Sequence, residues 1–150
     1  MTPAYWIASG GGIGRFPIAP GTAASLAAMP IGALSLWLDP RLLALLAIAT
    51  LVIGTWAIHA TKEQGDPGWI VIDEFAGQWV AMLGLGHVSL YGLIAAFILF
   101  RFFDITKPGP VGSAENLEGA FGVMADDIVA GLLTAAILFI MMNLIAVLIP

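Results

Sequence analysis

Acidic residues interrupt three otherwise apolar stretches of the sequence. Asp73 and Glu74 lie within DPGWIVIDEFAGQ, Asp104 lies within FRFFDITKPGPV, and Asp126 and Asp127 lie within GAFGVMADDIVAG. Ionisable side chains are costly in apolar segments, and by default they mark function there. Five carboxylates with few cations repel one another, so either several are protonated or a metal ion neutralises them.

The donor set favours a hard cation such as Mg²⁺ over zinc. The chain has no Cys, and we interpret its two histidines, His59 and His87, as interfacial or packing residues. Oxygen ligands are typical of Mg²⁺, which usually combines one or two carboxylates with substrate phosphate. The acidic residues therefore predict a phosphate substrate.

The expected helix positions of the acids allow two interpretations, a functional site or helix caps. Pro67 can start a helix, which would place Asp73 and Glu74 one to two turns inside it. Asp73 and Asp127 each precede a glycine by four residues, so a neighbouring helix or a ligand can come close on that face. Asp126 and Asp127 are expected at the start of the last apolar segment, where two caps stabilised by the helix dipole are the simpler alternative.

The elements that position these acids are expected to be membrane helices. The chain has 150 residues, of which 60% are hydrophobic and 10% charged, which is too apolar for a water-soluble domain. Its net charge of −5 argues against a nucleic-acid partner. Apolar segments run over about Ala23–Leu38, Leu42–Ala60, Trp69–Leu85, Leu90–Phe103 and Ile128–Ile149. The third and fourth could instead form one long bent helix over residues 69–103, but Gly84, Gly86 and His87 between them favour a turn. We predict one all-α domain over residues 1–150, a small polytopic bundle with about five membrane segments and a polar site at one interface.

Five crossings divide the polar segments between two faces. Residues 10–21, 61–67 and 104–127 fall on one face, and residues 39–41 and 84–89 fall on the other. The first face carries four of the five basic residues, namely Arg15, Lys62, Arg101 and Lys107. The positive-inside rule therefore places it, with nine of the ten carboxylates, in the cytoplasm.

The stretch GGGIGRFPIAPGTAAS has the glycine content of a phosphate-binding loop. It lacks the Lys of a Walker loop, and Pro17 and Pro20 interrupt a dinucleotide fingerprint. Thr22 is expected to cap the following helix, with Ser25 in its first turn. Free N–H groups there, the Gly21 backbone and nearby Arg15 can receive phosphate oxygens. A flexible loop with an ordinary cap is the alternative, and it is preferred for this stretch alone.

Together, RFPIAPGTAASL and the three acidic stretches resemble the phosphatidylglycerophosphatase A family in order and spacing. The resemblance implies a bacterial inner-membrane, Mg²⁺-dependent phosphatase that converts phosphatidylglycerophosphate into phosphatidylglycerol and phosphate at the cytoplasmic face. The family positions match the acids Asp73, Glu74, Asp104, Asp126 and Asp127, the bases Arg101 and Lys107, and the loop residues Pro20, Gly21, Thr22 and Ser25. One departure is Glu115 and Glu118, where family members often carry basic residues.

The residues narrow the chemistry to attack by water. No Cys, no Asp-x-Asp pair and no His in an Arg-rich motif is available as a nucleophile. We hypothesise that Asp73, Asp104 and Asp127 hold one or two Mg²⁺ that lower the pKa of the attacking water. Glu74 or Asp126 is the expected general base. Lys107 and Arg101 would balance charge on the phosphoryl group.

A small membrane transporter is the alternative from another class of protein. Intramembrane carboxylates can relay protons or cations, which would explain Asp73 and Glu74 but not Lys107. Transporter acids are expected near the middle of their spans, whereas these collect near one interface, where a phospholipid headgroup lies. The sequence does not indicate whether the protein is a monomer or an oligomer.

Overall fold

The structure, a computed structural model, describes residues 2–63 and 65–148, and every regular element within them is a helix. In chain order these are α1 (Pro3–Ala8), the 3₁₀ helix η1 (Ile13–Arg15), α2 (Pro20–Leu38), α3 (Pro40–Thr61), α4 (Ile72–Met82), the 3₁₀ helix η2 (Leu83–Leu85), α5 (Leu90–Thr106), α6 (Pro110–Glu115) and α7 (Gly119–Leu148). The all-α prediction is confirmed. Ile149, the expected end of the last segment, lies outside the described residues.

Three helices, α2, α3 and α7, are long and apolar enough to cross a membrane, by length and composition. They support a membrane protein. The prediction of about five membrane segments is not confirmed, because α4 has 11 residues and α5 has 17, whereas a crossing needs roughly 20. The expected segment from Trp69 is shortened at its start, since the helix begins only at Ile72.

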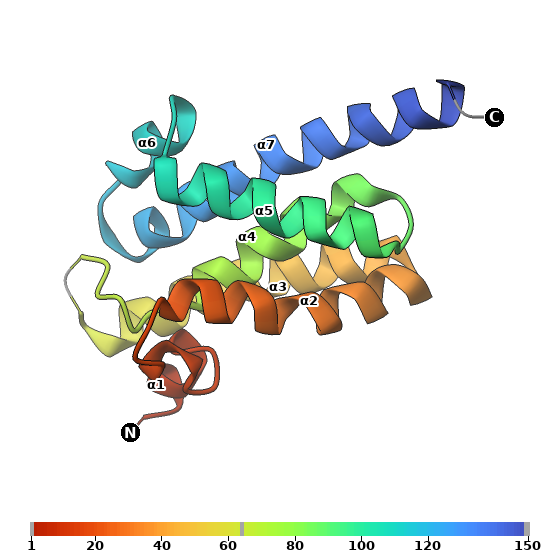
Figure 1. Ribbon diagram of the computed structural model, residues 1–150. Coiled ribbons are helices and arrows are strands. Elements are labelled where there is room, and N and C mark those ends of the chain that lie inside the picture. The colour runs from red at the N-terminus through yellow and green to blue at the C-terminus, as the bar shows by residue number, and fades with distance from the viewer. Residues whose placement is uncertain (1, 64, 149–150) are drawn as a thin grey trace.

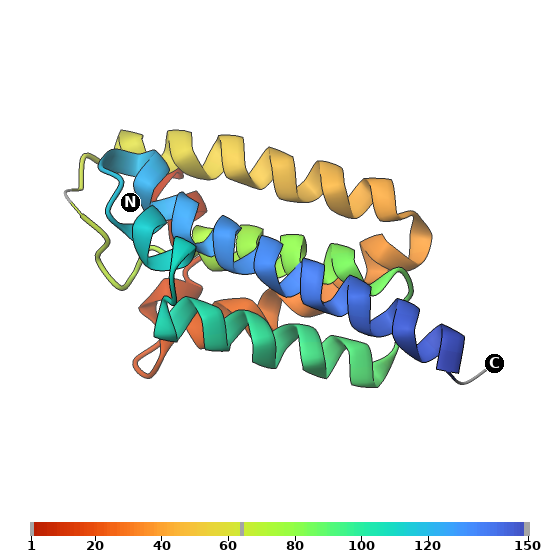
Figure 2. The same ribbon diagram turned by 90° about the horizontal axis from the view of Figure 1, so that it is seen from above.

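Helix α4 lies inside the bundle. It packs against α2, α3, α5 and α7, which surround it in the two views (Figure 1, Figure 2). Every residue from Phe75 to Met82 is buried. The surrounding helices instead expose large apolar side chains, such as Leu34, Leu45 and Ile98. Extensive exposed apolar surface of this kind is typical of contact with lipid, so the apolar exterior encloses a central helix that carries two acids.

Close packing between α4 and α7 depends on two glycines. A Cβ atom on Gly77 would lie 2.7 Å from the backbone oxygen of Asp127, and one on Gly131 would lie 2.5 Å from the backbone oxygen of Gly77. Small residues let helix backbones approach in this way. The expectation that glycines four residues after Asp73 and Asp127 admit a neighbouring helix is confirmed.

The glycine-rich N-terminal stretch packs against the chain that leads into α4. A Cβ atom on Gly14 would lie 1.9 Å from the carbonyl oxygen of Trp69. The N–H of Val71 donates to the carbonyl of Ala8 at 2.9 Å. Gly10 has φ 57°, and a Cβ atom there would lie 2.8 Å from the ring of Phe75. These glycines let the N-terminal stretch pack closely against the residues that lead into α4.

The polar connections gather at the two ends of the bundle. One end holds α1, η1, α6, the start of α2 and the residues that join α3 to α4 (Figure 1, left). The opposite end holds the turn between α2 and α3 and the turn between η2 and α5. The polar segments are divided between the two ends as the sequence predicted, and α6, the start of α7 and the start of α4 lie at the same end.

Candidate active site

Asp73 and Glu74 lie in the first turn of α4. The expected helix start at Pro67 is wrong, because a turn there is closed by the bond from the Ile70 N–H to the Pro67 carbonyl, at 2.9 Å. The N–H of the next residue, Val71, donates to the carbonyl of Ala8, so the helix begins only after it. Free N–H groups and the helix dipole at this end favour negative charge. The Asp73 residue is only 5% exposed.

Asp126 and Asp127 lie two turns inside α7, which begins at Gly119. The expectation that they start this helix is wrong. The apolar residues before them continue the helix, and the chain turns into it at Gly119, which has φ 78°. The dipole effect falls off within the first turn, so dipole-stabilised caps do not explain these acids. Both are buried.

The end of α5 supplies the fifth acid and two cations. Asp104 lies in the last turn, where the helix dipole disfavours negative charge. Arg101, one turn earlier, forms an ion pair with it. Lys107 caps the helix, and its ammonium donates to Asp126 Oδ2 at 2.6 Å.

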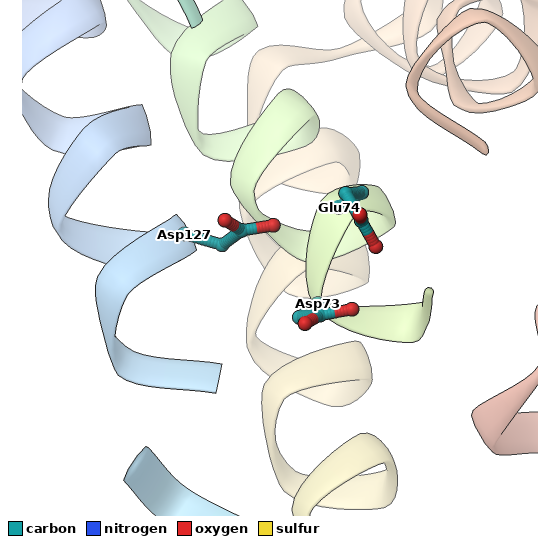
Figure 3. A group of neighbouring side chains, drawn as sticks. All are labelled: Asp73, Glu74 and Asp127. Atoms are coloured by element: carbon teal, nitrogen blue, oxygen red, sulfur yellow. The ribbon is translucent and has the colours of Figure 1, made fainter. Parts of the chain in front are cut away.

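The structure brings all five predicted acids together in two groups. Asp73, Glu74 and Asp127 form the first, and Asp104, Asp126 and Asp127 form the second. In each group, one carboxylate oxygen from every residue lies within 4.8 Å of the others. Asp127 belongs to both groups, and its side chain extends from α7 toward α4, which carries Asp73 and Glu74 (Figure 3). We call the five residues the acid cluster.

Positive charge within the protein compensates only part of the acid cluster. Arg101 and Lys107 pair with Glu74, Asp104 and Asp126. Within the described residues, Asp73 and Asp127 have no ion pair, and the buried atoms Asp73 Oδ1, Glu74 Oε2 and Asp127 Oδ2 have no hydrogen-bond partner. A buried, unpaired carboxylate is costly. Convergent oxygen donors without nitrogen or sulfur fit Mg²⁺.

Three of the predicted substrate-binding residues, Gly21, Ser25 and Arg101, contact one another or the acid cluster, whereas Arg15 is exposed. Gly21 lies directly against the cluster, since a Cβ atom there would be 2.0 Å from Glu74 Oε1. Ser25 is buried, donates to the Gly21 carbonyl at 3.0 Å and accepts from Arg101 at 3.5 Å. Arg101 thus ties α5 to α2 as well as to the acids. Arg15 is exposed at the end of η1.

The expected cap at the start of α2 differs from the observed one. The helix begins at Pro20, so Thr22 is its third residue instead of its N-cap. The N-cap is Ala19, whose backbone is left-handed with φ 48° and which makes no side-chain cap bond. Pro20 can take the first position because its missing N–H needs no partner there. The first turn of α2 therefore presents backbone, through Gly21, to Glu74.

A cleft of about 950 Å³ adjoins the acid cluster at Asp126 and Lys107. It lies between the end of α3, the α3–α4 connection, α6 and the start of α7, and its walls carry five acidic side chains and two lysines. Partial burial lowers the pKa of Lys107, but the hydrogen bonds that its ammonium donates to Asp126 and Glu115 raise the pKa by more, so the net shift is upward. Lys107 therefore stays charged.

Sequence reasoning missed two polar residues, Gln78 and Asp66. Gln78 is fully buried and its side-chain oxygen and nitrogen have no partner within the described residues. The signal was present, since Gln78 follows Glu74 by four residues and shares its helix face. Asp66, from the α3–α4 connection, lines the cleft. Restricted solvation, followed by the charge of Asp126, raises the pKa of Asp66 to about 6. No local pattern pointed to Asp66.

The chain is similar to known proteins over most of its length. Residues 6–142 match the family described as phosphatidylglycerophosphatase A. Phosphatidylglycerophosphatase A of Escherichia coli (strain K12) is 40% identical over 141 residues, which cover 91% of this chain and 82% of that protein. The protein of that name from Haemophilus influenzae is 35% identical over 144 residues, covering 93% and 88%. A Bacteroides thetaiotaomicron protein, provisionally named a phosphatidylinositol-3-phosphatase, is 40% identical over 134 residues, covering 83% and 84%. No solved structure matches the chain.

Proposed function

We propose that this chain, which belongs to the phosphatidylglycerophosphatase A family and is therefore a phosphatase, hydrolyses phosphatidylglycerophosphate to phosphatidylglycerol and phosphate. The observation that carries the proposal is the acid cluster, whose two groups share Asp127 at one end of an apolar bundle. A phosphate attached to a phospholipid is presented at the membrane surface. An acid cluster at the end of a bundle can reach it there.

The cofactor we propose is Mg²⁺, with Asp73, Asp104 and Asp127 holding one or two ions; Asp127 belongs to both carboxylate groups, Asp73 to the first and Asp104 to the second. The unpartnered oxygens of Asp73 and Asp127 support this choice. When bound, the ion would neutralise phosphate charge and lower the pKa of the attacking water. Glu74 is the better placed of the two predicted general bases, because its Oε2 has no hydrogen-bond partner in the described part of the chain, whereas Asp126 accepts a hydrogen bond from Lys107.

The two cations have different proposed roles. Lys107 lines the cleft and can meet an incoming phosphate. The guanidinium of Arg101 is 14% exposed and engages Asp104, Glu74 and Ser25. Arg101 therefore orients the acids and holds α2 against α5. Its positive charge stabilises the phosphoryl group at a distance, without direct contact, because the acids lie between them.

The phosphatase proposal explains more of the site than the transporter alternative. All the relatives named above carry phosphatase names. The acids also gather at one end of the bundle, whereas a transporter site is expected near the middle of its spans.

The substrate is tested by phosphate release from two purified lipids. We expect a higher kcat/KM for phosphatidylglycerophosphate than for phosphatidylinositol 3-phosphate, with Mg²⁺ and the full chain in detergent. A higher kcat/KM for phosphatidylinositol 3-phosphate would instead indicate the substrate that the name of the Bacteroides relative implies. Release from neither lipid, by protein that melts cooperatively, would reject the proposed function.

The location we propose is the bacterial inner membrane, with α4 and α5 as further crossings and the acid cluster facing the cytoplasm. Four of five basic residues at that end support this orientation. The chain has no Cys, so single cysteines can be placed at the exposed residues His87 and Glu63. In intact cells, a membrane-impermeant maleimide should label His87→Cys, and it should label Glu63→Cys only after permeabilisation. Labelling of both from one side would contradict this topology.

A further inference from the structure

Lys107 is held by two carboxylates that differ in burial. Its ammonium lies 2.6 Å from Asp126 Oδ2 and 3.0 Å from Glu115 Oε1. The Asp126 side chain is 9% exposed, whereas the Glu115 side chain is 54% exposed. Asp126 belongs to the acid cluster. Glu115 ends α6 and belongs to neither three-carboxylate group.

Both partners of Lys107 line the cleft. An ammonium has three donors, and the two carboxylates occupy two of them. A phosphate entering the cleft would therefore meet an ammonium that already has an anion on its solvent side. Phosphate and Glu115 carry charge of the same sign, so they repel each other when both are next to Lys107.

We propose that Glu115 occupies the place at Lys107 that a phosphate oxygen of the substrate takes, and that it must move into solvent before the phosphate can bind. This rests on the proposed function, which supplies a phosphate monoester as the ligand. Glu115 is the partner that leaves, because it is exposed and can be hydrated in the cleft. Asp126 stays, because it is buried and held within α7.

The expected size of the competition follows from the weakness of exposed ion pairs. Exposed ion pairs contribute only about 0–1 kcal/mol of free energy. At equilibrium the Lys107–Glu115 contact is therefore broken in roughly a sixth to a half of the molecules. Apparent affinity falls in proportion to the competent fraction. Glu115 therefore weakens phosphate binding by about 2- to 6-fold, and the loss shrinks at high ionic strength because salt screens the pair.

Titration calorimetry with inorganic phosphate tests the proposal on the full chain in detergent with Mg²⁺. Glu115→Gln should bind phosphate about 2- to 6-fold more tightly than the wild type at low salt, and the gain should diminish at high salt. Glu118→Gln is the matched control. It removes the same charge from the same cleft, and Glu118 has no ion pair with Lys107 in the described residues.

Several results would overturn the proposal. These are an unchanged or weaker affinity in Glu115→Gln, an equal gain in Glu118→Gln, and no phosphate binding by any of the three proteins. Melting temperatures close to that of the wild type confirm that both variants are folded. Failure of the proposed function is seen separately, as absent phosphate release from either lipid by the wild type, since the titration requires no turnover.

Discussion

Asp127→Asn should lower kcat by at least ~10²-fold, which corresponds to roughly 2.7 kcal/mol of transition-state stabilisation. Asp127 is common to both groups of the acid cluster, and its Oδ2 has no hydrogen-bond partner among the residues that the structure describes. The amide keeps the size of the side chain but removes its charge, so the variant should still insert and melt normally. The measurement is phosphate release from phosphatidylglycerophosphate by the purified variant.

Asp39→Asn is the matched control for this substitution. Asp39 caps α3 at the opposite end of the bundle, where its Oδ1 accepts from the Arg41 N–H at 2.8 Å. Asn caps helices about as well as Asp, so turnover should stay close to that of the wild type. Near-normal activity in Asp127→Asn would remove that acid from the mechanism. Equal losses at both positions would indicate a folding defect.

Removal of divalent cations should abolish phosphate release, and added Mg²⁺ should restore it. The physical reason is that Asp73 and Asp127 have no cationic partner in the described residues. Binding also stabilises the folded state, by about 2.7 kcal/mol at a free-ion concentration 100 times Kd. The melting temperature should therefore fall in excess EDTA, independently of activity.

The melting measurement also connects the ion to a residue. Asp127→Asn should lose most of the Mg²⁺-dependent rise in melting temperature, whereas Asp39→Asn should retain it. Full turnover in excess EDTA would contradict a metal-dependent mechanism. A Mg²⁺ response that is the same in both variants would place the ion away from Asp127.

The convergence of the acids could be predicted from sequence because it depends on chain order. Apolar segments that alternate direction bring the ends of the third, fourth and last segments to one side. The spacing of Asp73 to Gly77 and of Asp127 to Gly131 also indicated a close helix contact, which the structure confirms. Both inferences needed only local periodicity and the number of polar connections.

Helix boundaries were harder because contacts distant in sequence decide them. The start of α4 is set by Ala8 and Gly14, which hold the backbone of Val71 and Trp69. Asp126 and Asp127 suggested a helix start because they are polar, but the packing of α7 against α4 and the ion pair between Asp126 and Lys107 make a position inside α7 possible. The Lys107–Glu115 pair joins α5 to α6, and no local spacing identifies it.

The enclosure of α4 also constrains how the molecule is made. At 11 residues this helix is about 16 Å long, which is too short to be released alone into a bilayer, and its first turn carries Asp73 and Glu74. Its most extensive packing is against α7, which is synthesised after it. While the chain is still growing, α4 lacks that neighbour and its acids lack Asp127. The acid cluster is therefore completed only after α7 has been synthesised, and a chain interrupted before α7 contains neither of the two three-carboxylate groups.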